Sequence, residues 1–316
     1  MTPPASRPLG ASGIAVSELA LGSWRTYERI PRESGLAVMR AARELGINFL
    51  DDARYNDETG SAPLKTGYSE VVFGELFRES GWNRNEVVLA NKLWWEFWPD
   101  QKAEAELDAS LGRMKMDHVD LVYAERPPPG LTLEEIVHDV GALIRSGKAR
   151  AWGVLNWPAS LIAEAARTAA EQDVLPPSAA QLAYSLVNRS PVEDEDMMVA
   201  LGSARASVVA SFTLQGGALT GKYASPGAEG RLVGSIEDKM YAHAAQAGRE
   251  VSALAKRIGV GPAALAIAFA LLNPRVASVL FGSTSPEQVR DNVRAVELAS
   301  SLDEGTVNEL RKIGST

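Results

Sequence analysis

The sequence predicts an α/β protein of the (β/α)8 TIM-barrel class. Short apolar runs alternate with stretches of helical periodicity, and most runs begin about 30 to 40 residues apart, the length of one β/α unit. Runs that are apolar throughout are typical of parallel strands covered on both faces. Eight such runs are expected to close into one barrel domain over residues 1–316. They are Leu19–Gly22, Asn48–Asp52, Val87–Lys92, His118–Glu125, Ala149–Asn156, Ser178–Ser185, Ser207–Leu214 and Val276–Ser283.

The segments between the runs support this prediction. Gly35–Gly46 and Gln101–Met114 carry apolar residues at helical spacing with charges on the other face, as outer-ring helices do. The interval from Leu214 to Val276 is longer than the others and contains the Gly/Pro-rich stretch Tyr223–Gly234, which predicts a long loop able to cover a cofactor. A doubly wound sheet is the competing architecture, but no GxGxxG motif follows the first run.

Composition excludes several classes of function. The chain has 316 residues and a formal net charge of -8, so it would repel a polyphosphate backbone, and we expect no nucleic-acid partner. It contains no cysteine, which excludes disulfides, thiolate catalysis and Cys-based metal sites, and no metal site is predicted. The N-terminus lacks a signal-peptide pattern and the longest apolar run, Ala263–Leu272, is too short for a membrane span. We therefore expect a cytoplasmic protein with no membrane partner.

Polar residues at the ends of different strands give the main clue to function. In this fold the chemistry lies at the C-terminal strand ends, so Asp51, Lys92 and Glu125 should meet at one mouth. A charged lysine beside a phenol lowers the pKa of that phenol, which makes Tyr55 a candidate proton donor at neutral pH. From these residues alone, a simple buried ion pair is an equally good explanation.

Eight segments, in order along almost the whole chain, resemble the aldo-keto reductase family. The resemblance implies an NAD(P)H-dependent oxidoreductase on a TIM barrel preceded by an N-terminal β-hairpin. The segments are RPLGASGIAVSELALGSW (Arg7–Trp24), GINFLDDARY (Gly46–Tyr55), GYSEVVFGELF (Gly67–Phe77), NKLWW (Asn91–Trp95), GKARAWGVLNW (Gly147–Trp157), AAQLAYSLVNR (Ala179–Arg189), LQGGALTGKY (Leu214–Tyr223) and GSTSPEQVRDN (Gly282–Asn292).

By this resemblance, Asp51 and Lys92 occupy the aspartate and lysine positions of the family's Asp-Tyr-Lys-His tetrad. The family tyrosine usually follows the aspartate by five positions, where this chain has Asn56, whereas Tyr55 follows it by four. We expect a one-residue deletion in the loop that leaves Tyr55 as the proton donor. The alternatives are that the tyrosine is lost, or that Tyr68 replaces it.

Glu125 stands where the resemblance places the tetrad histidine, and none of the chain's three histidines fits that position. An apolar mouth favours a protonated carboxyl, so Glu125 is a candidate donor of a hydrogen bond or a proton. Alternatively it is a carboxylate paired with Arg126 or Lys92. Steroid double-bond reductases of the family also carry glutamate there, and this implies reduction of a conjugated C=C or C=N as well as a carbonyl.

The resemblance also assigns a cofactor site. Asn156 and Gln181 match the side chains that hold the nicotinamide carboxamide, with Leu155 in place of the more frequent serine. The stacking aromatic corresponds to Ser211, with Phe212 one position later. The other cofactor positions are Trp24, Leu214, Gly216, Lys222, Gly282, Thr284, Gln288, Asp291 and Asn292. NADPH is the expected cofactor because members of the family usually bind it. NADH is the alternative, because Ser285 stands where many members carry an arginine.

Tryptophans gather at the predicted strand ends and indicate an aromatic mouth for a flat, partly apolar small-molecule substrate. They are Trp24, Trp94, Trp95, Trp98 and Trp157, whereas Trp82 and Trp152 are expected to be structural. We assign Trp24, Trp94, Trp95 and Asn56 to the substrate. A cofactor-binding regulatory protein, like the potassium-channel beta subunits that resemble the same family, is the alternative function. The sequence predicts no particular oligomeric state.

Overall fold

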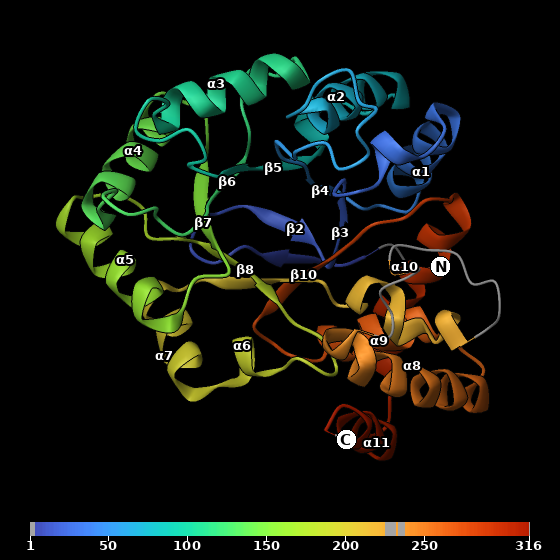
Figure 1. Cartoon of the computed structure of the whole chain (residues 1–316). Coiled ribbons are helices and arrows are strands. Elements are labelled where there is room, and N and C mark those ends of the chain that lie inside the picture. The colour runs from blue at the N-terminus through green and yellow to red at the C-terminus, as the bar shows by residue number, and fades with distance from the viewer. Residues whose placement is uncertain (1–3, 225–231, 233–237, 316) are drawn as a thin grey trace.

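The computed structural model describes residues 4–224, 232 and 238–315, and it shows a closed barrel of eight parallel strands with helices around it (Figure 1). Each predicted apolar run coincides with one barrel strand to within a few residues, and β5 extends one residue beyond its run, so the TIM-barrel prediction is confirmed. Around the barrel the strands are β10 (Val276–Phe281), β3 (Leu19–Gly22), β4 (Phe49–Asp51), β5 (Val88–Leu93), β6 (Leu121–Ala124), β7 (Ala151–Leu155), β8 (Ala179–Ala183) and β9 (Ser207–Ser211).

An antiparallel hairpin precedes the barrel, as the resemblance implied. It consists of β1 (Ser6–Pro8) and β2 (Ala15–Ser17), paired with Arg7 opposite Val16. Leu9, Ile14 and Val16 of the hairpin belong to the same buried cluster as side chains of the barrel strands. The hairpin therefore closes the end of the barrel at which the strands begin.

Helices surround the strands (Figure 1). The two helices predicted from periodicity are present, although each starts a few residues from the expected position. The helices are α1 (Arg32–Glu44), α2 (Tyr68–Ser80), α3 (Ala103–Met114), α4 (Leu133–Arg145), α5 (Ala159–Glu171), α6 (Ser190–Glu193), α7 (Glu195–Ala204), α8 (Lys239–Ile258), α9 (Pro262–Leu271), α10 (Pro286–Ser301) and α11 (Glu304–Ile313), with 3-10 turns η1 (Tyr27–Arg29), η2 (Arg84–Glu86), η3 (Gln215–Thr220) and η4 (Lys222–Ala224).

Most of the predicted loop Tyr223–Gly234 lies outside the described residues. Within the described part of the chain, no single helix is long and apolar enough to cross a membrane. The bent pair Tyr241–Ile258 and Pro262–Leu271 reaches the required length and apolar composition only when the two helices are counted together.

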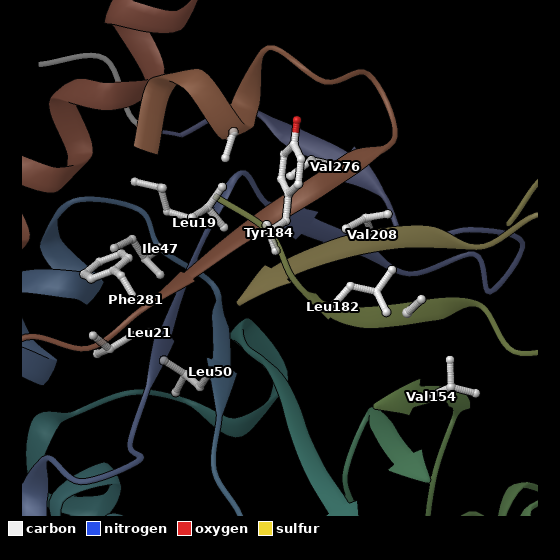
Figure 2. Packing of buried hydrophobic residues seen from close by; sticks show 14 of the residues in the cluster. Leu19, Leu21, Ile47, Leu50, Val154, Leu182, Tyr184, Val208, Val276 and Phe281 are labelled. Carbon is white, nitrogen blue, oxygen red and sulfur yellow. The ribbon is translucent and has the colours of Figure 1, made fainter. Parts of the chain in front are cut away.

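Successive side chains along each strand point alternately into two buried layers. Leu19, Leu21 and Leu50 belong to the layer between the strands and the helices, part of which Figure 2 shows. Ala20 and Phe49 belong to the second cluster, which fills the barrel interior. Because side chains on a strand point to alternate faces, residues two positions after an interior residue also face inward.

This rule orients the site. Asp51 lies two positions after Phe49, Lys92 two after Ala90, Glu125 two after Tyr123, Gln181 two after Ala179 and Ser211 two after Val209, and each of these reference residues is interior. Five predicted site residues therefore share the inward face at the C-terminal end of the barrel.

Candidate active site

A cavity of about 960 Å³ opens at the C-terminal ends of the strands. Its wall contains all of the predicted site residues except Asn56 and Trp95. The predicted residues on the wall are Trp24, Asp51, Tyr55, Lys92, Trp94, Glu125, Asn156, Gln181, Ser211, Phe212, Leu214, Gly216, Lys222, Gly282, Thr284, Gln288, Asp291 and Asn292. Residues that are far apart in the sequence therefore surround one space.

Four side chains form a connected hydrogen-bond chain in this wall. The ammonium group of Lys92, at the end of β5, donates to Asp51 Oδ1 on β4, and it lies 3.2 Å from the Tyr55 hydroxyl. Gln181 on β8 donates from Nε2 to Asp51 Oδ2 over 2.9 Å. Asp51, Lys92 and Gln181 are buried. Because both oxygens of the Asp51 carboxylate have hydrogen-bond partners, the buried ion pair is satisfied.

Geometry distinguishes the three residues considered for the tyrosine position. Tyr55 reaches Lys92 from the loop after β4, while Asn56 is exposed and donates to Glu96 Oε1 over 3.3 Å. Tyr68 begins α2 and packs partly buried against the outer layer. Only Tyr55 of these three lines the cavity, and the assignment of Asn56 to the substrate wall is wrong.

The expected direction of the Tyr55 pKa is also wrong. Burial raises the pKa of the Tyr55 phenol well above its usual value, and the charge of Asp51 raises it further. The positive charge of Lys92 does not reverse this effect, because Lys92 is already paired with Asp51. The phenol consequently keeps its proton at neutral pH.

Glu125 follows β6 at the cavity wall and is half-buried. Its Oε1 accepts the backbone N–H of Arg126 over 2.9 Å, and its carbonyl oxygen accepts the indole N–H of Trp95 over 3.0 Å. The Arg126 guanidinium donates instead to the Asn156 carbonyl oxygen. No ion pair joins Glu125 to Arg126 or Lys92 within the described chain, so the pairing expected as the alternative is absent.

The other side of the cavity is formed by amides and glycines. Asn156 has a left-handed backbone with φ of 52°, and its Oδ1 accepts the Ala183 N–H over 3.2 Å. In η3, Gly216 and Gly217 have φ of 65° and 93°, which brings bare backbone to the cavity. A Cβ added to Gly217 would lie 2.9 Å from Lys222 Cε.

An aromatic side chain does reach the cavity after β9, but it is not at the position inferred from the resemblance. Ser211 ends β9, and Phe212 follows with φ of 55°. Both line the cavity. The left-handed backbone at Phe212 is what turns a side chain one position beyond the strand toward this wall.

The start of α10 borders the far end of the cavity. Ser285 is its N-cap and accepts the Gln288 N–H over 3.4 Å, while the Thr284 N–H donates to Gln288 Oε1 over 2.9 Å. Thr284, Gln288 and Asn292 line the cavity there. Glu287 in the first turn and Asp291 on the cavity wall are acidic neighbours of this helix start. The free backbone N–H groups of a helix N-terminus suit a phosphate.

The aromatic mouth is smaller than expected. Trp24 and Trp94 line the cavity, and the ring centroids of Trp94 and Tyr55 are 6.0 Å apart. Trp95 and Trp157 are buried in the outer layer and Trp98 packs against it, so the assignment of Trp95 to the substrate is wrong. Trp95 turns away from the cavity because its backbone is left-handed, with φ of 60°. Trp82 and Trp152 are buried, as expected of structural residues.

One buried acid near the mouth was missed by sequence reasoning. Glu106 of α3 accepts the backbone N–H groups of Trp94 and Trp95. A signal existed, because Glu106 lies on the same helical face as Ala103, Leu107 and Ser110, where apolar and small residues prevail. A charge on such a face requires a partner.

Comparison with known proteins identifies the family. The model of the aldo/keto reductase family matches residues 18–315. A putative voltage-gated potassium channel subunit beta from Schizosaccharomyces pombe is 33% identical, over 97% of this chain and 91% of that protein. A probable voltage-gated potassium channel subunit beta from Oryza sativa subsp. japonica is 32% identical, over 96% of this chain and 95% of that protein. The chain belongs to the aldo/keto reductase family.

Proposed function

We propose that this protein is an NAD(P)H-dependent oxidoreductase that reduces a carbonyl or a conjugated C=C or C=N bond in an apolar or aromatic small molecule. The observation that carries the proposal is the 3.2 Å contact between Lys92 Nζ and the Tyr55 hydroxyl at the wall of the cavity. A protonated phenol beside a fixed ammonium group is suited to give up a proton during a reduction.

The cavity fits a nicotinamide dinucleotide. Gly216 and Gly217 expose backbone beside Lys222, which suits a pyrophosphate, and the start of α10 suits the adenosine phosphate. Asn156 and Gln181 offer neutral amides for the carboxamide. When bound, the reduced cofactor supplies a hydride from C4 of its nicotinamide. NADPH is our choice, because members of this family generally bind it.

Proton delivery follows from the side chains. Tyr55 holds the proton on its hydroxyl oxygen, because burial raises its pKa. As the proton leaves, negative charge develops on that oxygen, 3.2 Å from the Lys92 ammonium, which stabilises it. Asp51 accepts a hydrogen bond from the ammonium group and holds it in place, and Gln181 in turn donates to Asp51.

Glu125 supplies the second polar group of the substrate wall. One of its oxygens accepts the Arg126 N–H, and its other oxygen is the group we propose to polarise the substrate. A hydrogen bond from this oxygen to the oxygen of an enone favours hydride addition to the conjugated carbon. Trp24 and Trp94 provide the flat apolar surfaces of the same cavity.

The test is a turnover assay with NADPH on a panel of an aromatic aldehyde, a cyclic enone and a cyclic imine. We expect oxidation of NADPH with at least one of them, loss of turnover in Lys92→Met and normal turnover in the exposed variant Lys312→Met. Equal turnover in wild type and Lys92→Met would contradict the proposal. Fluorescence titration with NADPH and NADH tests the cofactor, and tighter binding of NADH would overturn our choice.

A second candidate function is a cofactor-binding regulatory protein. Two relatives are named as potassium channel beta subunits, and both match nearly the whole chain. NADPH binding without turnover on the whole panel would favour this candidate. The cytoplasmic location and the absence of nucleic-acid and membrane partners stay predictions.

A further inference from the structure

A buried carboxylate fixes the backbone where the chain leaves β5. Glu106 of α3 is buried, and its Oε1 and Oε2 accept the N–H groups of Trp94 and Trp95 over 2.9 and 3.2 Å. Trp95 has φ of 60°, a conformation that a bulky residue rarely adopts. Glu106 therefore holds a strained turn that sends Trp94 to the cavity and Trp95 to the outer layer.

A buried guanidinium fixes the loop after β4 in the same way. Arg54 directly precedes Tyr55 and is 4% exposed. Its Nη1 donates to Glu96 Oε2 over 2.6 Å and to Thr66 Oγ1 over 2.9 Å. Its Nη2 lies 3.5 Å from Glu106 Oε1. One side chain thus contacts both sides of its own loop, the loop after β5 and helix α3.

The two loops present neighbouring side chains to the cavity. The rings of Tyr55 and Trp94 lie with centroids 6.0 Å apart, and Lys92, two positions before Trp94, contacts the Tyr55 hydroxyl. Arg54 and Glu106 do not line the cavity themselves. A planar guanidinium with several fixed donors sets position and direction in a way that a flexible ammonium group does not.

We propose that Arg54 and Glu106 are positioning residues, which together hold Tyr55 over Lys92 and hold Trp94 against Tyr55. The proposal rests on the proposed function in one respect, namely that Tyr55 is the proton donor. It also accounts for the position of Tyr55 only four residues after Asp51, because Arg54, directly before Tyr55, is held by Thr66 on one side and by Glu96 and Glu106 on the other.

Hydrogen exchange in the protein without cofactor tests the mechanical part. We expect at least one of the amides of Trp94 and Trp95 to exchange at least ten-fold faster in Glu106→Gln, because the glutamine oxygen replaces only one of the two acceptors. We also expect faster exchange at these amides in Arg54→Met, although Arg54 does not bond to them. Unchanged exchange at Trp94 and Trp95 in Arg54→Met would overturn the proposal.

The matched control is Asp120→Asn at the opposite end of the barrel. Asp120 is also buried, accepts the Leu89 N–H over 2.9 Å and pairs with Arg84 over 2.8 Å. This variant should speed exchange at Leu89 and leave Trp94 and Trp95 unchanged. If it affected Trp94 and Trp95 as strongly as Arg54→Met does, general destabilisation would explain the result and the proposal would be wrong.

Kinetics test the functional part. We expect kcat to fall about 10- to 100-fold in Arg54→Met, because small displacements of a reacting group are costly, while the Kd of NADPH changes less than two-fold. Arg54→Lys keeps the charge but lacks the planar guanidinium, so its kcat should lie between those of wild type and Arg54→Met. Loss of protection with unchanged kcat would refute the positioning role. If wild type showed no turnover, the proposed function would fail, while hydrogen exchange would still decide whether Arg54 and Glu106 hold the loops.

Discussion

The hydroxyl of Tyr55 lies 3.2 Å from Nζ of Lys92, although Tyr55 follows Asp51 by one position fewer than the family pattern. The neighbouring Asn56 is directed to Glu96 at the surface. Tyr55 therefore makes the contact between phenol and ammonium group from this position, and several consequences can be measured.

Replacing Tyr55 by phenylalanine should remove the proton donor and keep the ring. We expect kcat to fall by a factor of roughly 10² to 10⁴, the usual contribution of a positioned general acid, with little change in the Kd of NADPH. Asn56→Ala is the matched control and should change kcat less than two-fold. A larger loss of kcat in Asn56→Ala than in Tyr55→Phe would show that Tyr55 is not the proton donor.

Replacing Lys92 by methionine should destabilise the fold as well as stop turnover. The variant leaves Asp51 buried and without its cation, which costs on the order of 3–5 kcal/mol in the free energy of unfolding. The double variant Asp51→Asn/Lys92→Met removes both charges and should recover much of that loss. Urea denaturation of the three proteins tests this, and a double variant no more stable than Lys92→Met would contradict the buried-charge explanation.

Asp52 should make the stability of the protein depend on pH. Its side chain is buried, Ser23 donates to its Oδ1, and burial together with the charge of Glu70 raises its pKa well above the usual value. The folded state therefore binds a proton more tightly than the unfolded state, so stability is lost as the pH rises from about 4 toward the raised pKa.

Asp52→Asn removes this dependence and keeps an acceptor for Ser23. We expect its free energy of unfolding to exceed that of wild type by a margin that grows between pH 4 and pH 7. Asp57 is the control of opposite sign, since hydrogen bonds from Thr59 lower its pKa. Asp57→Asn should lose a little stability near pH 7, and a margin for Asp52→Asn that shrank with pH would reverse our assignment.

Gly217 should tolerate a side chain poorly. Its φ is 93°, a conformation that residues with a Cβ rarely adopt, and a Cβ here would also displace the flexible Lys222 side chain, whose Cε would lie 2.9 Å away. Gly217→Ala is therefore expected to lower the free energy of unfolding by about 1 kcal/mol or more and to weaken NADPH binding. Gly202 in α7 has no atom within 4 Å of such a Cβ. Gly202→Ala should raise stability by up to about 1 kcal/mol and leave NADPH binding unchanged. Equal effects of the two changes on binding would remove Gly217 from the cofactor site.

Glu125 should decide which bond is reduced. We expect Glu125→His to lower the rate on a cyclic enone at least ten-fold and to raise the rate on an aromatic aldehyde, because histidine is the family residue for carbonyl reduction. The ratio of kcat/KM for the two substrates is the measurement. If the enone rate stayed intact and the aldehyde rate did not increase, Glu125 would have no part in the choice.

Much of the fold and part of the site could be predicted from patterns in the sequence. The spacing of the apolar runs determines the eight strands, and their ends place Asp51, Lys92 and Glu125 at one mouth. The pKa of Tyr55 could not be predicted in this way, because its burial depends on how separate loops pack. The fate of adjacent Trp94 and Trp95 depends on a left-handed turn held by Glu106, and periodicity contains no information on that turn.

Gln181 has two roles in the function that we propose. Its amide faces the cavity where a carboxamide would be held, and the same amide donates to Asp51. Any substitution at Gln181 therefore alters ligand affinity and the ion pair below it together, so mutagenesis at this position cannot assign a defect to one of them. A homologue with another residue at this position would change its contact with the cofactor and would also need another partner for Asp51. Gln181 therefore limits how the site can diverge.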